Sequence, residues 1–343
     1  MKRNRGAALV TVLVIVFIVM AIVANLTVTN FRMIKRLENR QLIEQATTIA
    51  YSAMDFSRAV LATSGATSST DTLNDVWAKG LPKTLLMDEI YMSGYLQDEQ
   101  SKFNINDLVA SGQVNPNVLS QFTALLGYLN LPQSLAYNIA YYMAAPQFQS
   151  DIMQQYIRGK PAYRPAGRPL VDLSELILVK GMTPEINQKL VQYVTAIPVN
   201  GYGLTVESME SAAQNNKQAT LPVPTGFGSV VNVNTASAEV IAAKGGIPLN
   251  VAQRMISYRN SQPFKTTQDI TTFLTTNGVN TSSNNTPNKN GPTLNISGLG
   301  VSSSYFTIHA VVDDQADQFR WVGFVYRQNR SGQWPQILWQ HPE

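Results

Sequence analysis

The sequence predicts an α+β protein. One long N-terminal helix, membrane-spanning in its first half, is expected to pack on a small antiparallel sheet that a large all-α inserted domain interrupts. Three observations support this prediction: an uninterrupted helical segment opens the chain, short alternating segments occur near both ends of the remaining sequence, and helical periodicity fills the region between them.

The chain opens with a candidate membrane span. Residues 7–31 carry no charge and are mostly Val, Ile, Leu, Ala and Met, which is long enough to cross a hydrocarbon core of ~30 Å. No small-residue cleavage site closes this segment, so a spanning helix is favoured over a removed secretory signal. Lys2, Arg3 and Arg5 before the span favour a cytoplasmic N-terminus, although three basic residues after it weaken the asymmetry.

The helix is expected to continue beyond the span, because no proline or glycine interrupts residues 7–64. A helix of ~55 residues would be ~80 Å long. Its outer half is amphipathic, and Arg40 and Glu44 are spaced to form an ion pair. The apolar positions expected to face the downstream domain are Ile34, Leu37, Leu42, Ala46, Ile49, Ala53, Phe56 and Val60.

Composition excludes several kinds of chemistry. The chain has no cysteine, which rules out disulfides, a thiol nucleophile and cysteine-ligated metals. The net charge of +4 comes from the flanks of the apolar segment, since residues 1–40 hold seven basic residues against Glu38 alone. The remaining chain is therefore faintly acidic, which argues against nucleic acid as a partner.

The middle of the chain is predicted to be helical and to contain related units. The segments 129–143, 180–194 and 244–259 each place a proline or tight turn before an amphipathic helix. "SELILVKG" and "AEVIAAKG" also align, so the last two units are each expected to be helix, turn and helix. Ser174 and either Thr235 or Ser237 are the expected N-caps.

Strands are predicted on both sides of this region. Residues 88–107 are expected to form two short strands with a turn at Asp98 and Glu99. Residues 304–314 and 318–328 alternate like a hairpin, and 336–343 would form a last strand. The strand-rich ends therefore bracket a helical insert.

The N-terminus resembles the prepilin signature of type IV pilins and type II secretion pseudopilins. A short basic leader ends at Gly6, and an apolar helix begins at once with Ala7. The resemblance implies that a prepilin peptidase cuts after Gly6 and methylates Ala7, while the span remains as an anchor. The family usually has phenylalanine or methionine at the first mature position and glutamate at the fifth, whereas this chain has Ala7 and Thr11.

One class of the family lacks that glutamate, namely the K-type minor pseudopilin of type II secretion. Thr11 can instead return its hydroxyl to the carbonyl of Ala7. "KFNIND", "VDLSELILVKGMTPEI", "VNVNTASAEVIAAKGG" and "YFTIHAVV" are similar to recurrent segments of this class, and the likeness runs from Lys2 to the C-terminus. An ordinary residue of an uncleaved anchor is the alternative interpretation of Thr11.

The resemblance implies a pilin-like domain organisation and a structural role. The expected parts are a leader at 1–6, the membrane half of the helix at 7–30, pilin-like segments at 31–107 and 291–343, and an all-helical inserted domain at 108–290. The implied protein is a non-enzymatic subunit at the tip of the periplasmic pseudopilus, single-pass in the bacterial inner membrane with a cytoplasmic N-terminus. Implied partners are other minor pseudopilins and the prepilin peptidase, with secreted substrates and the secretin as further candidates.

Two rival functions remain open at this point. Helix-turn-helix units on a single anchor are also found in membrane-tethered DNA receptors, but residues 171–276 carry equal numbers of acidic and basic residues. The hairpins "KGMTP" and "KGGIP" also lack a separated Gly-x-Gly. A type IV pilus minor pilin is the second rival.

The sequence predicts no catalytic residues. His309 and His341 are the only histidines, and both lie in or beside predicted strands, so neither a histidine metal cluster nor a Ser-His-Asp arrangement is indicated. Asp313, Asp314 and Asp317 are candidate calcium ligands. Their spacing matches no loop motif, and three acids at a hairpin tip are most often a solvated turn, so the sequence predicts no cofactor, with calcium as the one candidate.

Overall fold

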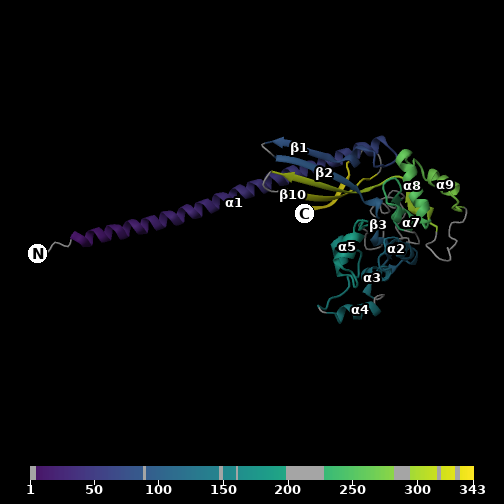
Figure 1. The fold of residues 1–343 in the computed structure, drawn as a ribbon, viewed down its shortest axis with the longest axis horizontal. Helices are drawn as coiled ribbons and strands as arrows, with labels where there is room; N and C mark the ends of the chain where they lie inside the picture. The colour runs from purple at the N-terminus through teal and green to yellow at the C-terminus, as the bar shows by residue number, and fades with distance from the viewer. Residues whose placement is uncertain are drawn as a thin grey trace, which may run out of the picture.

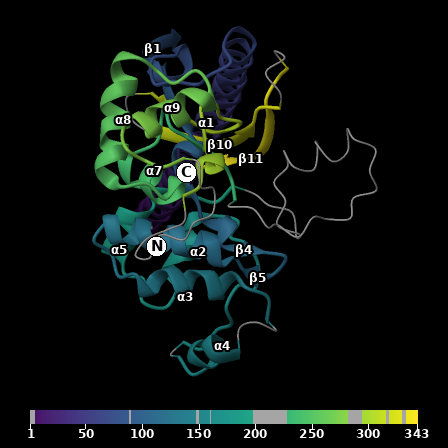
Figure 2. The ribbon, with the colours of Figure 1, turned by 90° about the vertical axis from the view of Figure 1, so that its right-hand side faces the viewer.

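The protein is a long rod that ends in a broad head (Figure 1). The computed structural model describes residues 5–87, 90–146, 150–159, 161–197, 228–281, 294–314, 318–328 and 333–343. The rod enters the head beside a small sheet, and the helical part of the head extends away from the rod's axis (Figures 1 and 2).

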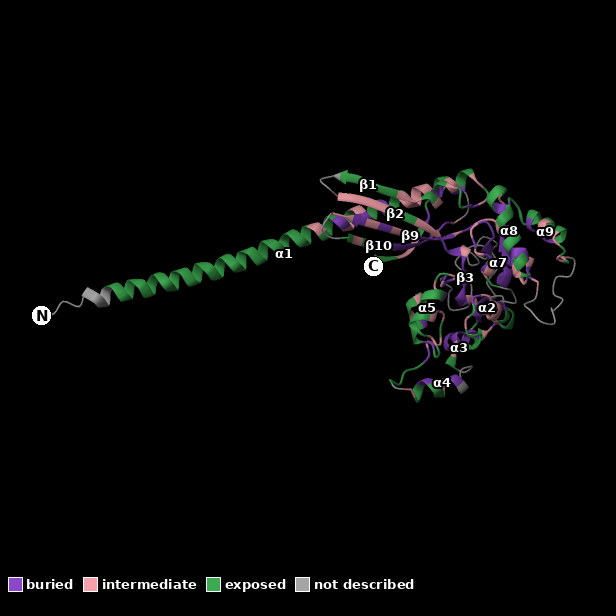
Figure 3. Cartoon of the chain, viewed as in Figure 1, coloured by how far each residue is buried: buried purple, intermediate pink, exposed green. Residues whose placement is uncertain are grey.

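The rod is a single helix, α1 (Arg5–Thr67), of 63 residues. At 1.5 Å per residue it is ~95 Å long. The predicted continuous helix is therefore confirmed, and it runs slightly further than expected. Arg40 Nε donates to Glu44 Oε1 at 3.0 Å, as the spacing predicted. Figure 3 shows the first half of α1 exposed along its length, with burial starting only where it reaches the sheet.

The sheet has five antiparallel strands in the order β1-β2-β9-β10-β11. Its strands are β1 (Leu81–Met87), β2 (Ile90–Asp98), β9 (Tyr305–Asp313), β10 (Gln318–Tyr326) and β11 (Gln336–Pro342). The predicted C-terminal hairpin and last strand are confirmed. Strands from both ends of the chain thus pair directly, since Tyr95 in β2 lies opposite His309 in β9.

The prediction of two strands within 88–107 is only partly right. The first strand, β2, ends at Asp98 as expected, and the short 3₁₀ helix η2 (Glu99–Ser101) makes the turn. The second is cut to β3 (Phe103–Asn104), which pairs in parallel with β6 (Val194–Thr195) instead of with β2. The Asn104 side chain accepts from the backbone N–H of Asn106 and so starts the 3₁₀ helix η3 (Ile105–Leu108). β2 pairs instead with β9 on one side and with β1 on the other, and the sequence did not reveal β1.

The outer part of α1 packs on one face of the sheet through small side chains. Ala46, Ala50 and Ala53 are buried against strands β9 and β10, which lets the helix approach closely. At Gly323 in β10 an added Cβ would lie 2.8 Å from Met54 Sδ, so the end of the Met54 side chain would have to shift to admit a larger residue. The remaining buried residues of this core are Leu61, Trp77, Phe306, Ile308, Ala310, Val312, Trp321 and Val325.

Three of the residues predicted to face the head are exposed. Ile34 and Leu37 lie before the part of α1 that reaches the sheet, so nothing in the described structure covers them. Phe56 lies on a side of α1 that the sheet does not cover. Contact with the sheet begins at Ala46. Between Arg32 and Ala46 the helix is a bare neck, because every residue there except the half-buried Leu42 is exposed.

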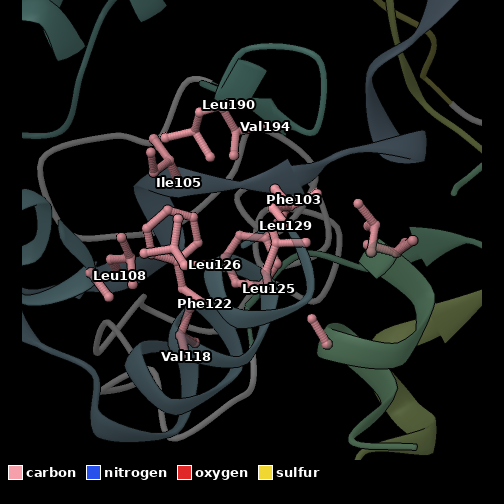
Figure 4. Packing of buried hydrophobic residues seen from close by; sticks show 14 of the residues in the cluster. Phe103, Ile105, Leu108, Val118, Phe122, Leu125, Leu126, Leu129, Leu190 and Val194 are labelled. Carbon is pink, nitrogen blue, oxygen red and sulfur yellow. The ribbon is translucent and has the colours of Figure 1, made fainter. Parts of the chain in front are cut away.

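The inserted region has its own core. Its helices are α2 (Pro116–Tyr128), α3 (Ser134–Met143), α4 (Ser150–Ile157), α5 (Pro184–Leu190), α7 (Ala238–Gly245), α8 (Leu249–Ser261) and α9 (Thr267–Thr276), with 3₁₀ helices η5 (Leu173–Leu178) and η6 (Ile296–Gly298). Figure 4 labels Phe122 of α2 and Phe103 among the residues of this core. Their ring centroids are 5.4 Å apart. This core is separate from the one between α1 and the sheet.

The prediction of a purely helical inserted region is wrong. The predicted segment 108–290 contains β4 (Val109–Ala110) paired with β5 (Gln113–Val114), and also β6 and β7 (Val231–Asn232). Their partners β3 and β8 (Leu299–Gly300) lie in segments predicted to be pilin-like, so the inserted region extends beyond its predicted bounds at both ends. Each strand has only two residues, too few to give an alternating pattern in the sequence. The β3-β6 and β7-β8 pairs join segments far apart in the chain, which is why periodicity could not predict them.

The related units have different local structures. In the last one, α7 ends at Gly246 in the left-handed conformation (φ 64°) and α8 follows, so helix, turn and helix is confirmed. In the earlier one the first helix is the 3₁₀ helix η5. Ser237 caps α7 as one of the two expected residues, but the cap of η5 is Asp172, not Ser174. Asp172 accepts from the Ser174 N–H and forms a capping box with Glu175.

Candidate membrane anchor and assembly surface

The first half of α1 is strongly apolar and has no protein cover. An 18-residue window has a mean hydropathy of 3.0 and none of it is buried. Its large apolar side chains between Leu9 and Phe31 are 49% to 72% exposed and point in all directions around the helix. Such a surface is costly in water, at about 25 cal/mol per Å². The length and composition suit a membrane span.

The predicted processing residues lie at the end of the rod that is far from the head (Figure 1). Gly6 and Ala7 belong to the first turns of α1, and Thr11 follows one turn later with an exposed side chain. Residues 1–4 of the leader lie outside the described residues. Cleavage after Gly6, methylation of Ala7 and the role of Thr11 stay predictions.

A groove runs along one flank of α1 where the helix meets the head, and we call it the flank groove. It consists of two adjoining hollows of about 150 and 530 Å³ that share Phe56, Val60 and Val76 as lining residues. The inner hollow reaches the sheet at Gly94 and Leu96, while the outer one follows α1 to Ser68. Its opposite wall is formed by residues 74–77, which include the start of the 3₁₀ helix η1 (Val76–Lys79).

The rim of the flank groove exposes large apolar side chains. Phe56 is 55% exposed and Val76 is 70% exposed, and Leu73 beside them is also open. These residues belong to segments that come together only in the folded protein. The inner hollow is lined mainly by apolar residues and the outer one mainly by polar residues, and exposed apolar side chains gathered at a hollow are typical of a protein contact surface.

A buried polar cluster ties the rod to the sheet. The Arg327 guanidinium, at the end of β10, forms an ion pair with Asp71 at 2.7 Å, and both side chains are almost completely buried. Arg327 also donates to the Leu61 carbonyl of α1 at 3.4 Å and lies over the Phe306 ring at 4.9 Å. One side chain therefore contacts α1, the sheet and the loop that follows α1.

Asp98 extends this cluster to the inserted region. It is fully buried at the end of β2 and accepts hydrogen bonds from the hydroxyls of Ser303 and Thr235, both at 2.6 Å, and from the Gln100 N–H at 2.8 Å. Burial raises the pKa of Asp98 to about 6, because desolvation outweighs the hydrogen bonds that favour the charged form. Thr235 comes from the inserted region, so Asp98 joins the two parts of the head.

We expect stability to depend on pH through Asp98. Its unperturbed pKa is 3.8, so between about pH 4 and pH 6 the folded protein keeps a proton that the unfolded chain loses. As the pH rises through this window, the free energy of unfolding should therefore fall by about 2 to 3 kcal/mol, and it should stay level at higher pH. In Asp98→Asn, which resembles the protonated form, this slope should be absent.

The measurement is chemical unfolding of the full chain in detergent between pH 4 and pH 7.5. Asp55→Asn is the matched control, because Asp55 is exposed on α1 and should leave the wild-type profile intact. An Asp98→Asn profile with the same slope as the wild type would contradict the assignment.

Of the two hairpin lysines in the units that suggested DNA binding, Lys244 is withdrawn from solvent, whereas Lys180 is exposed and bonded to a neighbouring side chain. Lys244 in the last unit is completely buried, 3.4 Å from Asp107 Oδ2 and 5.2 Å above the Phe103 ring. Lys180 in the earlier unit donates to Gln155 Oε1 at 2.7 Å. The packing role of these units is therefore favoured over phosphate binding.

The predicted calcium ligands lie where the sequence placed them, at the tip of the β9-β10 hairpin, but Asp317 is outside the described residues. Asp313 forms an ion pair with Lys83 of β1 at 2.7 Å, and Lys83 lies over the Tyr91 ring. Among the described residues no group of three or more His, Cys, Asp or Glu could hold a metal. Nothing described supports calcium here.

Both histidines lie in strands, as predicted. His309 of β9 stacks on Tyr95 with ring centroids 4.4 Å apart, and His341 of β11 stacks on Trp339 at 5.2 Å. Burial lowers the pKa of His309, which favours its neutral form. Neither histidine therefore points to a catalytic arrangement in the described structure.

Comparison with known proteins agrees with this architecture. Two family models described as "Type II secretion system (T2SS), protein K" match residues 101–199 and 231–290. A relative named "Type II secretion system protein K" from Pseudomonas aeruginosa is 28% identical over 298 residues, covering 82% of this chain and 81% of the relative. A protein of the same name from Klebsiella pneumoniae is 28% identical over 223 residues, covering 61% and 67% respectively.

A solved structure shares the fold. It is "The Crystal Structure of the GspK-GspI-GspJ complex from enterotoxigenic Escherichia coli Type 2 Secretion System", and one of its chains superimposes with a TM-score of 0.65 at 20% identity. The match covers 90% of this chain and 99% of that chain. Nine-tenths of this chain therefore has a counterpart of known structure.

A membrane-type apolar helix whose outer half packs on a small antiparallel sheet defines a pilin-like subunit. The head adds a large, mainly helical region to that plan. The chain is similar to type II secretion system protein K in the segments that the two family models match and in its relatives, and these similarities support a minor pseudopilin. The family is structural, and neither a DNA receptor nor a type IV pilus minor pilin is favoured.

The sequence did not reveal the flank groove or the buried cluster. The helical stripe predicts that Phe56 faces the head, but Phe56 is exposed, because such a stripe does not show where the covering sheet stops. Asp71 and Arg327 are separated by 256 positions, so no local pattern connects them. The one available signal for Asp98 was its position at a predicted turn.

Proposed function

We propose that this minor pseudopilin lies at the tip of the periplasmic pseudopilus, where it helps to start assembly and so supports export of folded proteins across the outer membrane. The observation that carries the proposal is the shape of the molecule. The head extends well to one side of α1 (Figures 1 and 2), so subunits with slender heads can add beside the rod and below the head, but not above it.

The N-terminal segment supports the same position. The mature chain would begin at Ala7 after the peptidase cut and would lack an acidic fifth residue, because Thr11 stands there. A carboxylate in lipid costs about 2.5 to 3.5 kcal/mol unless it is paired, and a terminal subunit has no neighbour above to pair with. Thr11 avoids that cost.

The proposed location is the bacterial inner membrane, crossed once, with the N-terminus in the cytoplasm and the head in the periplasm. The proposed partners are other minor pseudopilins, by analogy with the solved complex of GspK with GspI and GspJ. Secreted proteins and the secretin are further proposed contacts of the exposed head. The role is structural, without catalysis.

Imaging of labelled pseudopili tests the position. A small epitope fused after Glu343, beside the sheet, should be found only at filament ends by electron microscopy. The same epitope on a major subunit should mark the whole shaft, which controls for access. Labels from this chain along the middle of continuous shafts would overturn the proposal.

A further inference from the structure

We propose that the hollow between α8 and α9 is a receptor site for a tyrosine side chain that a partner protein presents on a short helix. The hollow has a volume of about 480 Å³, within the range of protein ligand sites. α8 and α9 lie at the end of the head farthest from the N-terminal end of the rod (Figure 1), so a protein on the side opposite the anchor can reach them. This inference goes beyond the proposed function and does not depend on it.

Three aromatic rings form the apolar lining of the hollow. Tyr258 of α8, Phe264 between the two helices and Phe273 of α9 contact one another, with ring centroids 5.1 to 5.6 Å apart. Phe264 is buried, whereas Tyr258 is 37% exposed. Gln262 and Lys265 are exposed and line the same hollow. A phenol ring can therefore pack on the aromatic rings while its hydroxyl meets polar side chains.

The inserted region contains this arrangement twice, as a pair of asparagine clamps shows. The Asn106 side chain accepts from the Leu170 N–H at 2.8 Å and donates to the Leu170 carbonyl at 2.9 Å. The Asn234 side chain accepts from the Phe264 N–H at 3.0 Å and donates to the Phe264 carbonyl at 2.9 Å. Leu170 and Phe264 therefore hold equivalent positions.

A capped helix follows each clamp. Asp172 and Glu175 form a capping box at the start of η5, and Thr266 and Asp269 form one at the start of α9. Both boxes begin two residues after the clamped residue, so the local structure repeats. We call the two parts of the inserted region the first half, residues 104–180, and the second half, residues 232–277.

α3 and α8 correspond as well, but their tyrosines differ in exposure. Tyr142 and Tyr258 lie near the C-terminal ends of these helices, in the same register from Pro132 and Pro248. Tyr142 is 3% exposed, whereas Tyr258 is 37% exposed. The covering of this tyrosine is therefore what distinguishes the two halves.

In the first half an additional helix covers the tyrosine. The chain between Tyr142 and Leu170 contains α4, and the Tyr156 ring of α4 lies 5.7 Å from the Tyr142 ring. Tyr156 is only 3% exposed, and its hydroxyl accepts from the Lys180 N–H at 2.9 Å. α4 thus places one aromatic side chain beside α3 and holds it by its hydroxyl.

The second half leaves the equivalent place open. The chain passes from Tyr258 to Phe264 without an inserted helix. Thr272, the counterpart of Leu178 by position after the clamp, lines the hollow. In the first half the Leu178 carbonyl accepts from Tyr163, which follows α4. The hollow therefore corresponds to the place of α4 and the residues after it, and its occupant is a helix that presents a tyrosine as α4 does.

The occupant comes from a different protein. A second copy of this chain does not offer its own α4, because Tyr156 is already buried in the first half of that copy. α4 shows which chemistry suits the place, since Ile152 and Tyr156 are buried one turn apart while Gln154 and Gln155 are exposed. The expected partner segment is thus a short amphipathic helix with an aliphatic residue four positions before its tyrosine.

Fluorescence polarisation with a synthetic helix tests the proposal. The probe is a fluorescein-labelled peptide with the sequence of residues 150–160, closed by a hydrocarbon staple between positions 150 and 154, and Tyr156 is its one aromatic side chain. The full chain is titrated in lipid nanodiscs, because free detergent could enter the hollow. We expect a Kd of about 100 µM or tighter, and about tenfold weaker binding of the Tyr156→Ala peptide.

A chain variant locates the bound peptide. Thr272→Trp fills the hollow and should weaken binding by about tenfold or more. Thr275→Trp is the matched control, because Thr275 is also exposed on α9 but does not line the hollow, and its Kd should stay within about twofold of the wild type. Thermal unfolding shows whether each variant is folded. Thr276→Trp also fills the hollow and replaces Thr272→Trp if that variant is unfolded.

Several results would overturn the proposal. They are no binding of the stapled peptide, equal binding of its Tyr156→Ala form, and a Kd that Thr272→Trp leaves unchanged, which would place the peptide elsewhere. Binding of p-cresol in saturation-transfer NMR, without binding of the peptide, would assign the hollow to a small aromatic molecule instead. A dimer of the full chain that Thr272→Trp dissociates would assign it to a second copy. None of these results bears on the tip position.

Discussion

Arg327→Ala should lower the free energy of unfolding by about 3 to 5 kcal/mol, the cost of leaving one member of a buried ion pair without its counterion. The substitution removes the ion pair to Asp71, the contact with the Leu61 carbonyl and the packing over Phe306 together. It also opens space beside Gly65, where the Arg327 side chain lies against the helix. The junction of rod and sheet should therefore loosen.

Unfolding of the full chain in detergent by denaturant provides the measurement. Arg320→Ala is the control, because Arg320 lies on β10, the strand that Arg327 directly follows, but its side chain is exposed and bonded only locally to Gln318 among the contacts described. It should change stability by no more than about 0.5 kcal/mol. If the two variants lost the same stability, the buried cluster would not be the link that we describe.

Replacing Gly6 with valine should stop removal of the leader. Glycine has no Cβ, so it lets a peptidase approach the backbone at the bond to Ala7, whereas a branched side chain at that place obstructs it. Intact-mass spectrometry of the membrane-extracted wild type should show a chain that begins at methylated Ala7. The Gly6→Val variant should begin at Met1 and carry no methyl group.

Asn4→Leu provides the matched control, since it changes the size of a leader residue away from the expected cut. Its product should begin at Ala7 like the wild type. A wild-type chain from the same membranes that still begins at Met1 would mean that the span is an unprocessed anchor, as the alternative interpretation of Thr11 held.

The fold could be predicted where local pattern and tertiary structure agree. The continuous helix followed from the absence of proline and glycine, and the β9-β10 hairpin followed from clean alternation. β1 escaped detection because its apolar residues do not alternate, and Pro82 near its start is unusual inside a strand. The two-residue pairs such as β3 with β6 are held by contacts across the chain, which no window of sequence records.

The functional surface was harder to predict than the fold. The apolar span and the glycine before it consist of consecutive residues, so the sequence alone predicts them. The flank groove needs Phe56 from α1 and Val76 from the following loop to meet, and its existence depends on where the sheet edge lies. The buried cluster likewise depends on residues such as Asp71 and Arg327, whose separate positions in the chain look ordinary.

The bare neck of α1 fixes how high the head stands over the lipid. From Arg32 to Ala46 the rise is ~21 Å, whereas the headgroup layer on one side of a bilayer is only about 5 to 8 Å thick. A water-filled space therefore remains between the lipid headgroups and the sheet. It is tall enough for a helix of about 10 to 12 Å diameter to pass sideways. Neighbours could thus arrive laterally along the bilayer surface, without the head having to tilt out of their way.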